Sequence, residues 1–226
     1  MIDMNSGLGH GWRAVRRPLA ALALCGTLAV SLQGCFGLAV GGAVFGTMAA
    51  TDRRTLGAQT EDKTIAVKAI NQLSEVTNSR DHVNVASFNR KVLLTGEVRD
   101  ARTKAAVERE IASIEAVQSV VNELVVADAS SFSARSNDTL LTGKVKASFV
   151  DDGEIYANSI KVVTERGVVY LMGRVTQREG ARAAAIAAGV AGVQKVVKVF
   201  EYITDAELKE LNTAPPPAQN GTPGAS

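Results

Sequence analysis

An internal duplication constrains the fold of this 226-residue chain more than any other feature of its sequence. Segments from the first half return later in the same order: LLTGEV at 93–98 and YLMGRV at 170–175, VQSVV at 117–121 and VQKVV at 193–197, VKA at 67–69 and VKA at 145–147. Repetition at a fixed period indicates a repeated structural unit. We therefore expect two tandem copies of one domain. Because each copy is near the lower size limit for folding without disulfides or metal, we expect them to pack together.

Each copy is predicted to have the order helix, strand, strand, helix, strand. Apolar residues three or four positions apart mark the helices, and alternation marks the strands. In the first copy, these patterns place a helix over 61–77, a turn at Asn89-Arg90-Lys91, a second helix capped by Asp100 and a last strand over 118–126. In the second copy, they place a helix beginning at Asn137 or Asp138, a turn at 165–167, a helix with a Thr176 and Glu179 capping box and a strand over 193–203.

The N-terminal segment has the features of a lipoprotein signal peptide. Three arginines between 13 and 17 precede an uncharged stretch too short to span a bilayer, and Leu32-Gln33-Gly34-Cys35 closes it. This ending resembles a bacterial lipobox, which implies cleavage before Cys35 and covalent S-diacylglycerol and N-acyl lipid on it. Phe36 follows where Asp would imply retention in the inner membrane, so we expect the outer membrane, facing the periplasm. An ordinary secretory peptide and a buried helix that contains a cysteine are the alternatives.

Loss of residues 1–34 changes the charge balance. That segment holds three of the 25 Lys and Arg and one of the 23 Asp and Glu, so the rest of the chain has 22 of each. Nucleic-acid binding needs a clustered basic surface, which this balance does not favour. Since Cys25 leaves with the signal and Cys35 is acylated, the mature chain has no pair of thiols for a disulfide. Residues 36–50 are uncharged and glycine-rich, which favours a flexible tether over a helix packed in lipid.

The predicted fold class is α+β: two tandem αββαβ domains, each a three-stranded mixed sheet packed with two helices, behind a lipidated tether. Gly96 and Gly173 end equivalent strands, where we expect close backbone approach to exclude a side chain. The predicted boundaries are a signal peptide at 1–34, the tether at 35–60, the first domain at 61–127, a linker at 128–136, the second domain at 137–204, and a helical turn with a disordered Pro-rich tail at 205–226.

This layout resembles the BON domain family, in particular outer-membrane lipoproteins with two BON domains. The motifs that carry the resemblance are AATDRRT at 49–55, SNDT at 136–139, VVTERG at 162–167 and LMGRVT at 171–176. The resemblance implies an envelope-integrity protein that gathers at the division site. It also implies that the first helix of the second BON domain binds anionic phospholipid, with no other cofactor.

The matching helix here runs from Asp138 to Val150. Its lysines can meet lipid phosphates while its apolar side chains enter the acyl boundary. A core-facing helix with solvated lysines is the competing interpretation, and it accounts for the apolar residues at 141, 145 and 149. The phospholipid-binding residues that the resemblance implies are Leu140, Leu141, Lys144, Val145, Lys146, Ser148 and Phe149.

Other function classes have less support. His82 is the only histidine after the signal peptide, and we expect it to be solvated and not to join a metal or nucleophile site. Without a histidine or thiol site, catalysis would need an Asp/Glu pair that folding brings together. No sequence motif indicates such a pair, so we expect that the protein is not an enzyme. A scaffold that contacts outer-membrane assembly proteins remains the alternative, because the same helix or a free sheet edge can dock a protein. We expect a monomer.

Overall fold

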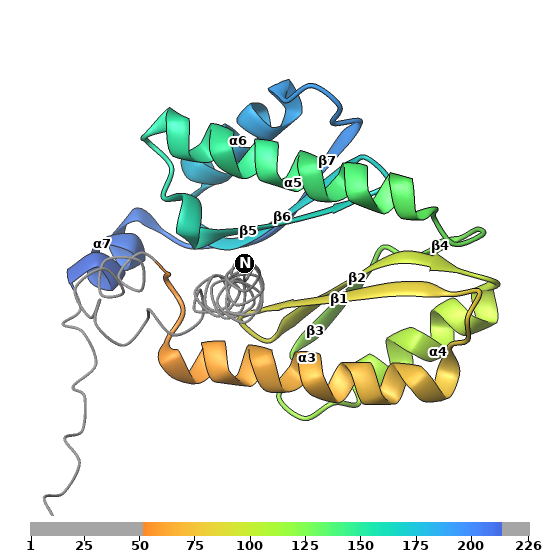
Figure 1. Ribbon diagram of the computed structural model, residues 1–226. Coiled ribbons are helices and arrows are strands. Elements are labelled where there is room, and N and C mark those ends of the chain that lie inside the picture. The colour runs from red at the N-terminus through yellow and green to blue at the C-terminus, as the bar shows by residue number, and fades with distance from the viewer. Residues whose placement is uncertain (1–51, 214–226) are drawn as a thin grey trace, which may run out of the picture. The chain divides into compact units, whose positions relative to one another are not determined.

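The computed structural model describes residues 52–213 and confirms an α+β fold with two similar domains. The first domain has helices α3 (Leu56–Val76) and α4 (Ala101–Ala112) and strands β1 (His82–Phe88), β2 (Lys91–Val98), β3 (Ser119–Asn122) and β4 (Val125–Val126). The second domain has α5 (Phe132–Asp152), the 3-10 turn η3 (Ala157–Ser159), β5 (Ile160–Glu165), β6 (Val168–Val175), α6 (Gln177–Gly189) and β7 (Lys195–Tyr202), followed by α7 (Asp205–Thr213). In each domain two helices cover one face of the sheet (Figure 1).

Both sheets mix antiparallel and parallel pairing, as expected for the αββαβ order. β1 and β2 are antiparallel, β3 and β4 are parallel to β2, and β5, β6 and β7 repeat the pattern. The single strand predicted over 118–126 is interrupted in the structure. Asn122 accepts a hydrogen bond from the backbone of Leu124, and Leu124 enters the core at the break.

Both first helices begin earlier than the sequence patterns predict. Thr55 caps α3, and Ser131 caps α5, each by accepting a hydrogen bond from the backbone three residues on. Residues 56–60 and 132–136, predicted to be tether and linker, are therefore helical. Asn137 and Asp138 lie inside α5 and do not cap it, because Ser131 satisfies the helix end first.

Burial shows how the two first helices correspond. Each buried position of α3 from residue 62 onward matches the position 76 residues later in α5. This register differs from the matching of 67–69 with 145–147 that sequence identity suggested, because Ala69 and not Val67 is equivalent to Val145. The matched pairs are Asp62 and Asp138, Ile65 and Leu141, Ala69 and Val145, and Leu73 and Phe149.

The sheet faces that carry no helices bury a third apolar cluster, which joins the two domains. Polar contacts also cross from one sheet to the other: Asn89 donates to Glu201, and Lys161 donates to the carbonyl of Ser87. The packing of the two copies on each other, expected from their small size, is present in the structure. The buried members of the cluster are Ala86, Phe88, Leu93, Tyr170, Met172 and Val199.

The end of the predicted tether is fastened to both domains. Arg53 makes a bidentate ion pair with Glu179 of α6, at 2.6 and 2.9 Å, and its side chain is buried. Arg54 pairs with Asp62 of α3 at 2.7 Å. Flexible chain therefore does not extend to residue 60. Cys35, the glycines of the tether and the Pro-rich tail lie outside the described residues.

Gly96 and Gly173, the two strand-end glycines, are required for different structural reasons. A Cβ on Gly96 would overlap the carbonyl oxygen of His82, and its φ of 114° lies in a region that L residues rarely adopt. Gly173 has no such φ, but its Cβ would lie 2.6 Å from the carbonyl oxygen of Ser159. Both positions thus have the close backbone approach expected from the sequence.

Candidate functional site

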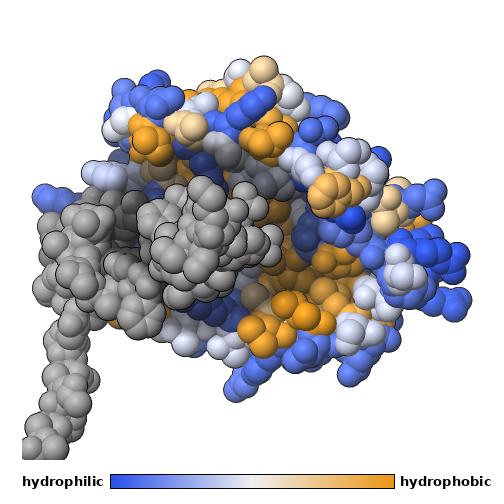
Figure 2. Space-filling view, viewed as in Figure 1, coloured by the Kyte–Doolittle hydropathy of each residue, from blue (hydrophilic) through white to orange (hydrophobic). Residues whose placement is uncertain are grey.

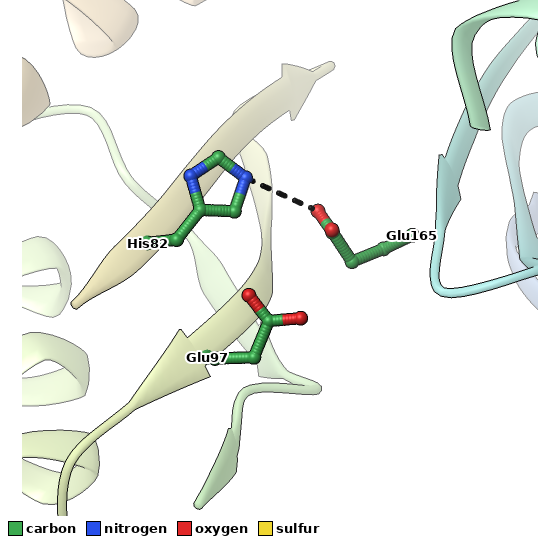
Figure 3. Close-up of side chains that lie close together, drawn as sticks. All are labelled: His82, Glu97 and Glu165. Carbon is green, nitrogen blue, oxygen red and sulfur yellow. Dashed lines mark ion pairs between the residues drawn. The ribbon is translucent and has the colours of Figure 1, made fainter. Parts of the chain in front are cut away.

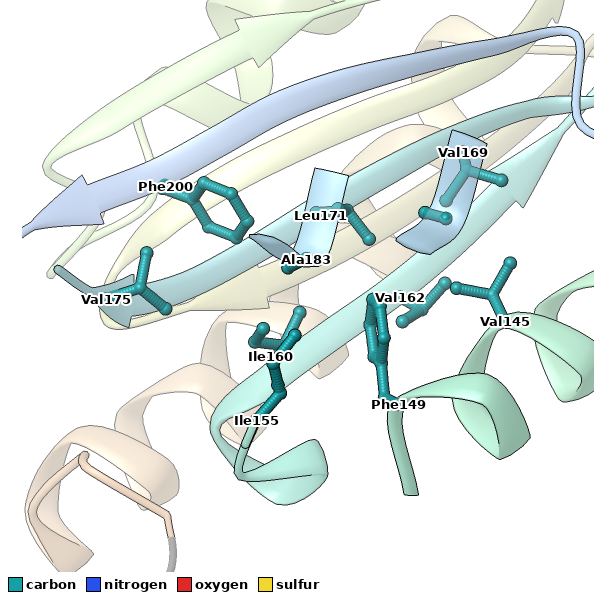
Figure 4. Packing of buried hydrophobic residues seen from close by; sticks show 11 residues of the cluster. Val145, Phe149, Ile155, Ile160, Val162, Val169, Leu171, Val175, Ala183 and Phe200 are labelled. Carbon is teal, nitrogen blue, oxygen red and sulfur yellow. The ribbon is translucent and has the colours of Figure 1, made fainter. Parts of the chain in front are cut away.

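The helix implied to bind lipid divides into a core face and an outer face. Leu141, Val145 and Phe149 are buried in the core of the second domain, where Val145 and Phe149 point toward the sheet (Figure 4). These three side chains cannot reach a membrane in this fold, so their assignment as lipid contacts is wrong. The core-facing interpretation of the 3.6-residue pattern applies to them instead.

The outer face of α5, opposite its core face, carries exposed apolar side chains. Phe132 is 80% exposed, Leu140 66% and Val150 68%. Phe132 and Val150 are 18 residues, or about five turns, apart and so point the same way. Figure 2 shows separate apolar side chains exposed on the surface over this helix. We define the outer face of α5 as Phe132, Leu140, Gly143, Ala147 and Val150.

Two lysines border this outer face. Lys144 and Lys146 are exposed, and the 100° rotation per residue places them on opposite sides of the apolar line. Ser148 is half-buried and lies toward the core side. Of the seven residues implied by the resemblance, Leu140, Lys144 and Lys146 are therefore the ones whose side chains are fully accessible.

Sequence patterns did not identify Phe132 as part of this face. The predicted linker included it, because Asn137 and Asp138 looked like the helix cap. The available signal was Ser131, an equally good capping residue, with Phe132 in phase with Val150.

A buried carboxylate fixes the position of α5 on its domain. Asp138 accepts hydrogen bonds from the backbone N–H groups of Arg166 and Gly167, both at 2.8 Å. These two residues form the two-residue turn between β5 and β6, with φ of 52° and 72°. Carboxylates that accept backbone N–H groups form strong, charge-assisted bonds. The core packing and this bond together hold the outer face toward solvent.

A second polar group lies between the domains. His82, predicted to be solvated, is half-buried at the start of β1, and its Nε2 lies 3.9 Å from the carboxylate of Glu165 at the end of β5. Glu97 of β2 lies beside them (Figure 3). Burial raises the pKa of Glu165, and the neighbouring charges of Glu97 and Asp138 raise it further. Folding thus gives His82 one acidic neighbour from its own sheet, Glu97, and one from the other copy, Glu165, which local sequence could not show.

Within residues 52–213, no helix is both long enough and apolar enough to cross a bilayer.

Two αββαβ units joined through their sheets define a tandem-domain protein, and comparisons with known proteins identify its family. The BON domain model matches residues 61–128 and 137–204, so the chain belongs to the BON domain family. It is 38% identical over 188 residues to Outer membrane lipoprotein DolP of Haemophilus influenzae, covering 82% of this chain and 97% of that protein.

Two further relatives are similar to a smaller part of the chain. The chain is 29% identical to the 21 kDa hemolysin of Actinobacillus pleuropneumoniae, over 67% of this chain and 79% of that protein. It is 31% identical to Osmotically-inducible protein Y of Escherichia coli K12, over 60% of this chain and 70% of that protein. The family resemblance inferred from the sequence motifs is thereby confirmed.

Proposed function

We propose that this protein is a non-enzymatic outer-membrane lipoprotein, anchored through Cys35 and facing the periplasm, that binds anionic phospholipid through the outer face of α5. Its similarity to a protein named as an outer membrane lipoprotein supports this localisation. The single histidine left after signal removal and the loss of both thiols support a role without catalysis. A contribution to envelope integrity at the division site follows from the family resemblance.

The observation that carries this proposal is the chemistry of the outer face of α5. Phe132, Leu140 and Val150 are exposed along a 21-residue helix, which is about 30 Å long. Lys144 and Lys146 stand on either side of the apolar line. A helix lying in the membrane interface needs this arrangement, with apolar side chains in the acyl boundary and flanking cations at the phosphates.

Liposome flotation tests the electrostatic half of the proposal. The mature chain with Cys35→Ala has no lipid anchor, so any flotation reports the folded domains. Lys144→Glu with Lys146→Glu should weaken binding to anionic vesicles by about 2–4 kcal/mol, since each near-surface basic residue contributes about 1 kcal/mol and reversal doubles the effect. Lys63→Glu with Lys68→Glu on α3 is the matched control and should leave flotation unchanged.

The apolar half is tested on the same vesicles. Leu140→Thr, Ala147→Asn and Val150→Ser together should weaken binding by about 2–3 kcal/mol through lost apolar burial. Leu140→Trp should strengthen it, because an indole ring suits headgroup depth. Wild-type chain that ignores anionic vesicles at low salt would contradict lipid binding and favour a protein partner for this face.

A further inference from the structure

We propose that His82, Glu97 and Glu165 form a zinc-binding site between the two BON domains. One ligand atom from each of the three residues lies within 4.8 Å of the others. The residues come from the start of β1, the end of β2 and the end of β5, so three strands from both sheets converge here (Figure 3). The site lies apart from the outer face of α5 and does not depend on lipid binding.

The charge at this cluster suits a cation. The side chains of Glu97 and Glu165 are 0% and 5% exposed, and two buried carboxylates that face each other repel. Arg166 is the cation that contacts Glu97, at 3.3 Å, and its side chain is half exposed. Asp138 adds further negative charge near Glu165. Buried charges in proteins are paired or coordinate metals, and a divalent ion would offset both glutamates.

Both glutamates at the cluster already have polar contacts, and Glu97 also accepts a hydrogen bond from the backbone N–H of Ser130 at 3.1 Å. His82 Nε2 and the Glu165 carboxylate are 3.9 Å apart, too far for a hydrogen bond. Asn84 lies between them: its amide donates to Glu165 at 2.6 Å and is 3.2 Å from His82 Nε2. Asn84 is exposed and can rotate away from the ring nitrogen while it still orients Glu165. Outer partners of this kind commonly fix the carboxylates that bind a metal.

The ligand set favours zinc over the hard cations. Calcium and magnesium take oxygen ligands, whereas one imidazole with two carboxylates suits a borderline ion such as Zn²⁺. Zinc–ligand bonds are about 2.0–2.2 Å, so the three atoms would move together by roughly 1 Å on binding. Water can complete the coordination. The ion would join β1 and β2 of the first domain to β5 of the second and tighten their contact.

Calorimetric zinc titration of the mature lipoprotein tests this site. The protein is purified in detergent without a histidine tag and stripped with a chelator. We expect one equivalent of Zn²⁺ to bind, with a rise in melting temperature and a shift of the ring signals of His82, the only histidine after residue 34. His82→Asn and Glu165→Gln should each weaken binding by at least about 100-fold, because removing a ligand should cost no less than the 10–100-fold typical of losing a residue that only orients a ligand.

The controls separate a built site from general attraction to acidic groups. Glu154→Gln removes an exposed carboxylate elsewhere and should leave zinc affinity unchanged. Glu165→Gln should fold at least as well as wild type without zinc, because it removes a buried charge. Failure of the wild type to bind an equivalent of zinc, or equal affinity in Glu165→Gln, would overturn the proposal.

Discussion

The helices α3 and α5 occupy the same place in the two domains, but their inner halves match more closely than their outer halves. Both have 21 residues, and both bury an aspartate and three apolar residues at equivalent positions. Their outer halves differ in polarity: Thr64, Asn71 and Ser74 of α3 stand where α5 has Leu140, Ala147 and Val150.

This difference distinguishes the residues that the fold requires from the surface residues that can vary without loss of the fold. The inner positions must fill a core and clamp a hairpin, so the same residue types serve in both copies. The outer positions face solvent, where a substitution costs little stability. α3 also exposes three large apolar side chains, Leu56, Val67 and Ile70. Polar residues, among them Lys63, Asn71 and Ser74, share that side of the helix. On α5 the apolar line continues through Leu140, Ala147 and Val150, and this continuation together with the family resemblance is why we propose lipid binding for the second domain.

The strand-end glycines should show the largest difference between the domains. Gly96→Ala should cost about 3–5 kcal/mol, because it adds both an unfavourable positive φ and a clash with His82. Gly173→Ala should cost about 1–3 kcal/mol, because it adds a clash with Ser159 alone. Urea unfolding of the two variants measures the difference, and a larger loss in Gly173→Ala would contradict this account.

Asp62 and Asp138, the buried aspartates of α3 and α5, should also differ in their contribution to stability, with the larger contribution again in the first domain. Asp62 accepts hydrogen bonds from Ser87, from the backbone of Asn89 and Arg90, and from Arg54, whereas Asp138 accepts its two bonds from the turn backbone. Asp62→Ala should therefore cost about 3–4 kcal/mol and Asp138→Ala about 2 kcal/mol, since each lost charged bond leaves a buried donor unpaired. Urea unfolding of the two variants measures the difference. Equal losses of unfolding free energy would show that only the hydrogen bonds from the turn N–H groups contribute.

The smallest expected effect is a change in how the stability of the Asp62→Asn variant depends on pH in acid. Burial disfavours ionisation of Asp62, but the bonds from Ser87, Arg90 and Arg54 outweigh it and hold its pKa below the ordinary value. A lowered folded-state pKa means that the stabilisation is complete above about pH 4 and is lost as pH falls through the folded-state pKa. Asp62→Asn should therefore be less stable than the wild type at pH 7 yet lose less stability than the wild type between pH 4 and pH 2. Parallel pH curves for the two proteins would contradict this.

The local patterns of the sequence determined the order of elements, the repeat and the caps of α4 and α6. Asp100 caps α4, and Thr176 with Glu179 forms the capping box of α6, as predicted. Thr204 and Glu207 likewise hold the start of α7. These features depend on residues three or four positions apart, so one stretch of chain contains all the information they need.

The tertiary structure decided which side chains are free and which polar groups meet. Leu141 and Leu140 are neighbours in sequence, and only the position of the sheet makes one core and the other surface. Arg53 forms an ion pair with Glu179, which lies 126 residues later in the chain. His82 lies close to Glu165 of the other domain. Such pairings depend on how two separately folded sheets pack, and that packing is set by buried area over many side chains, which no local pattern encodes.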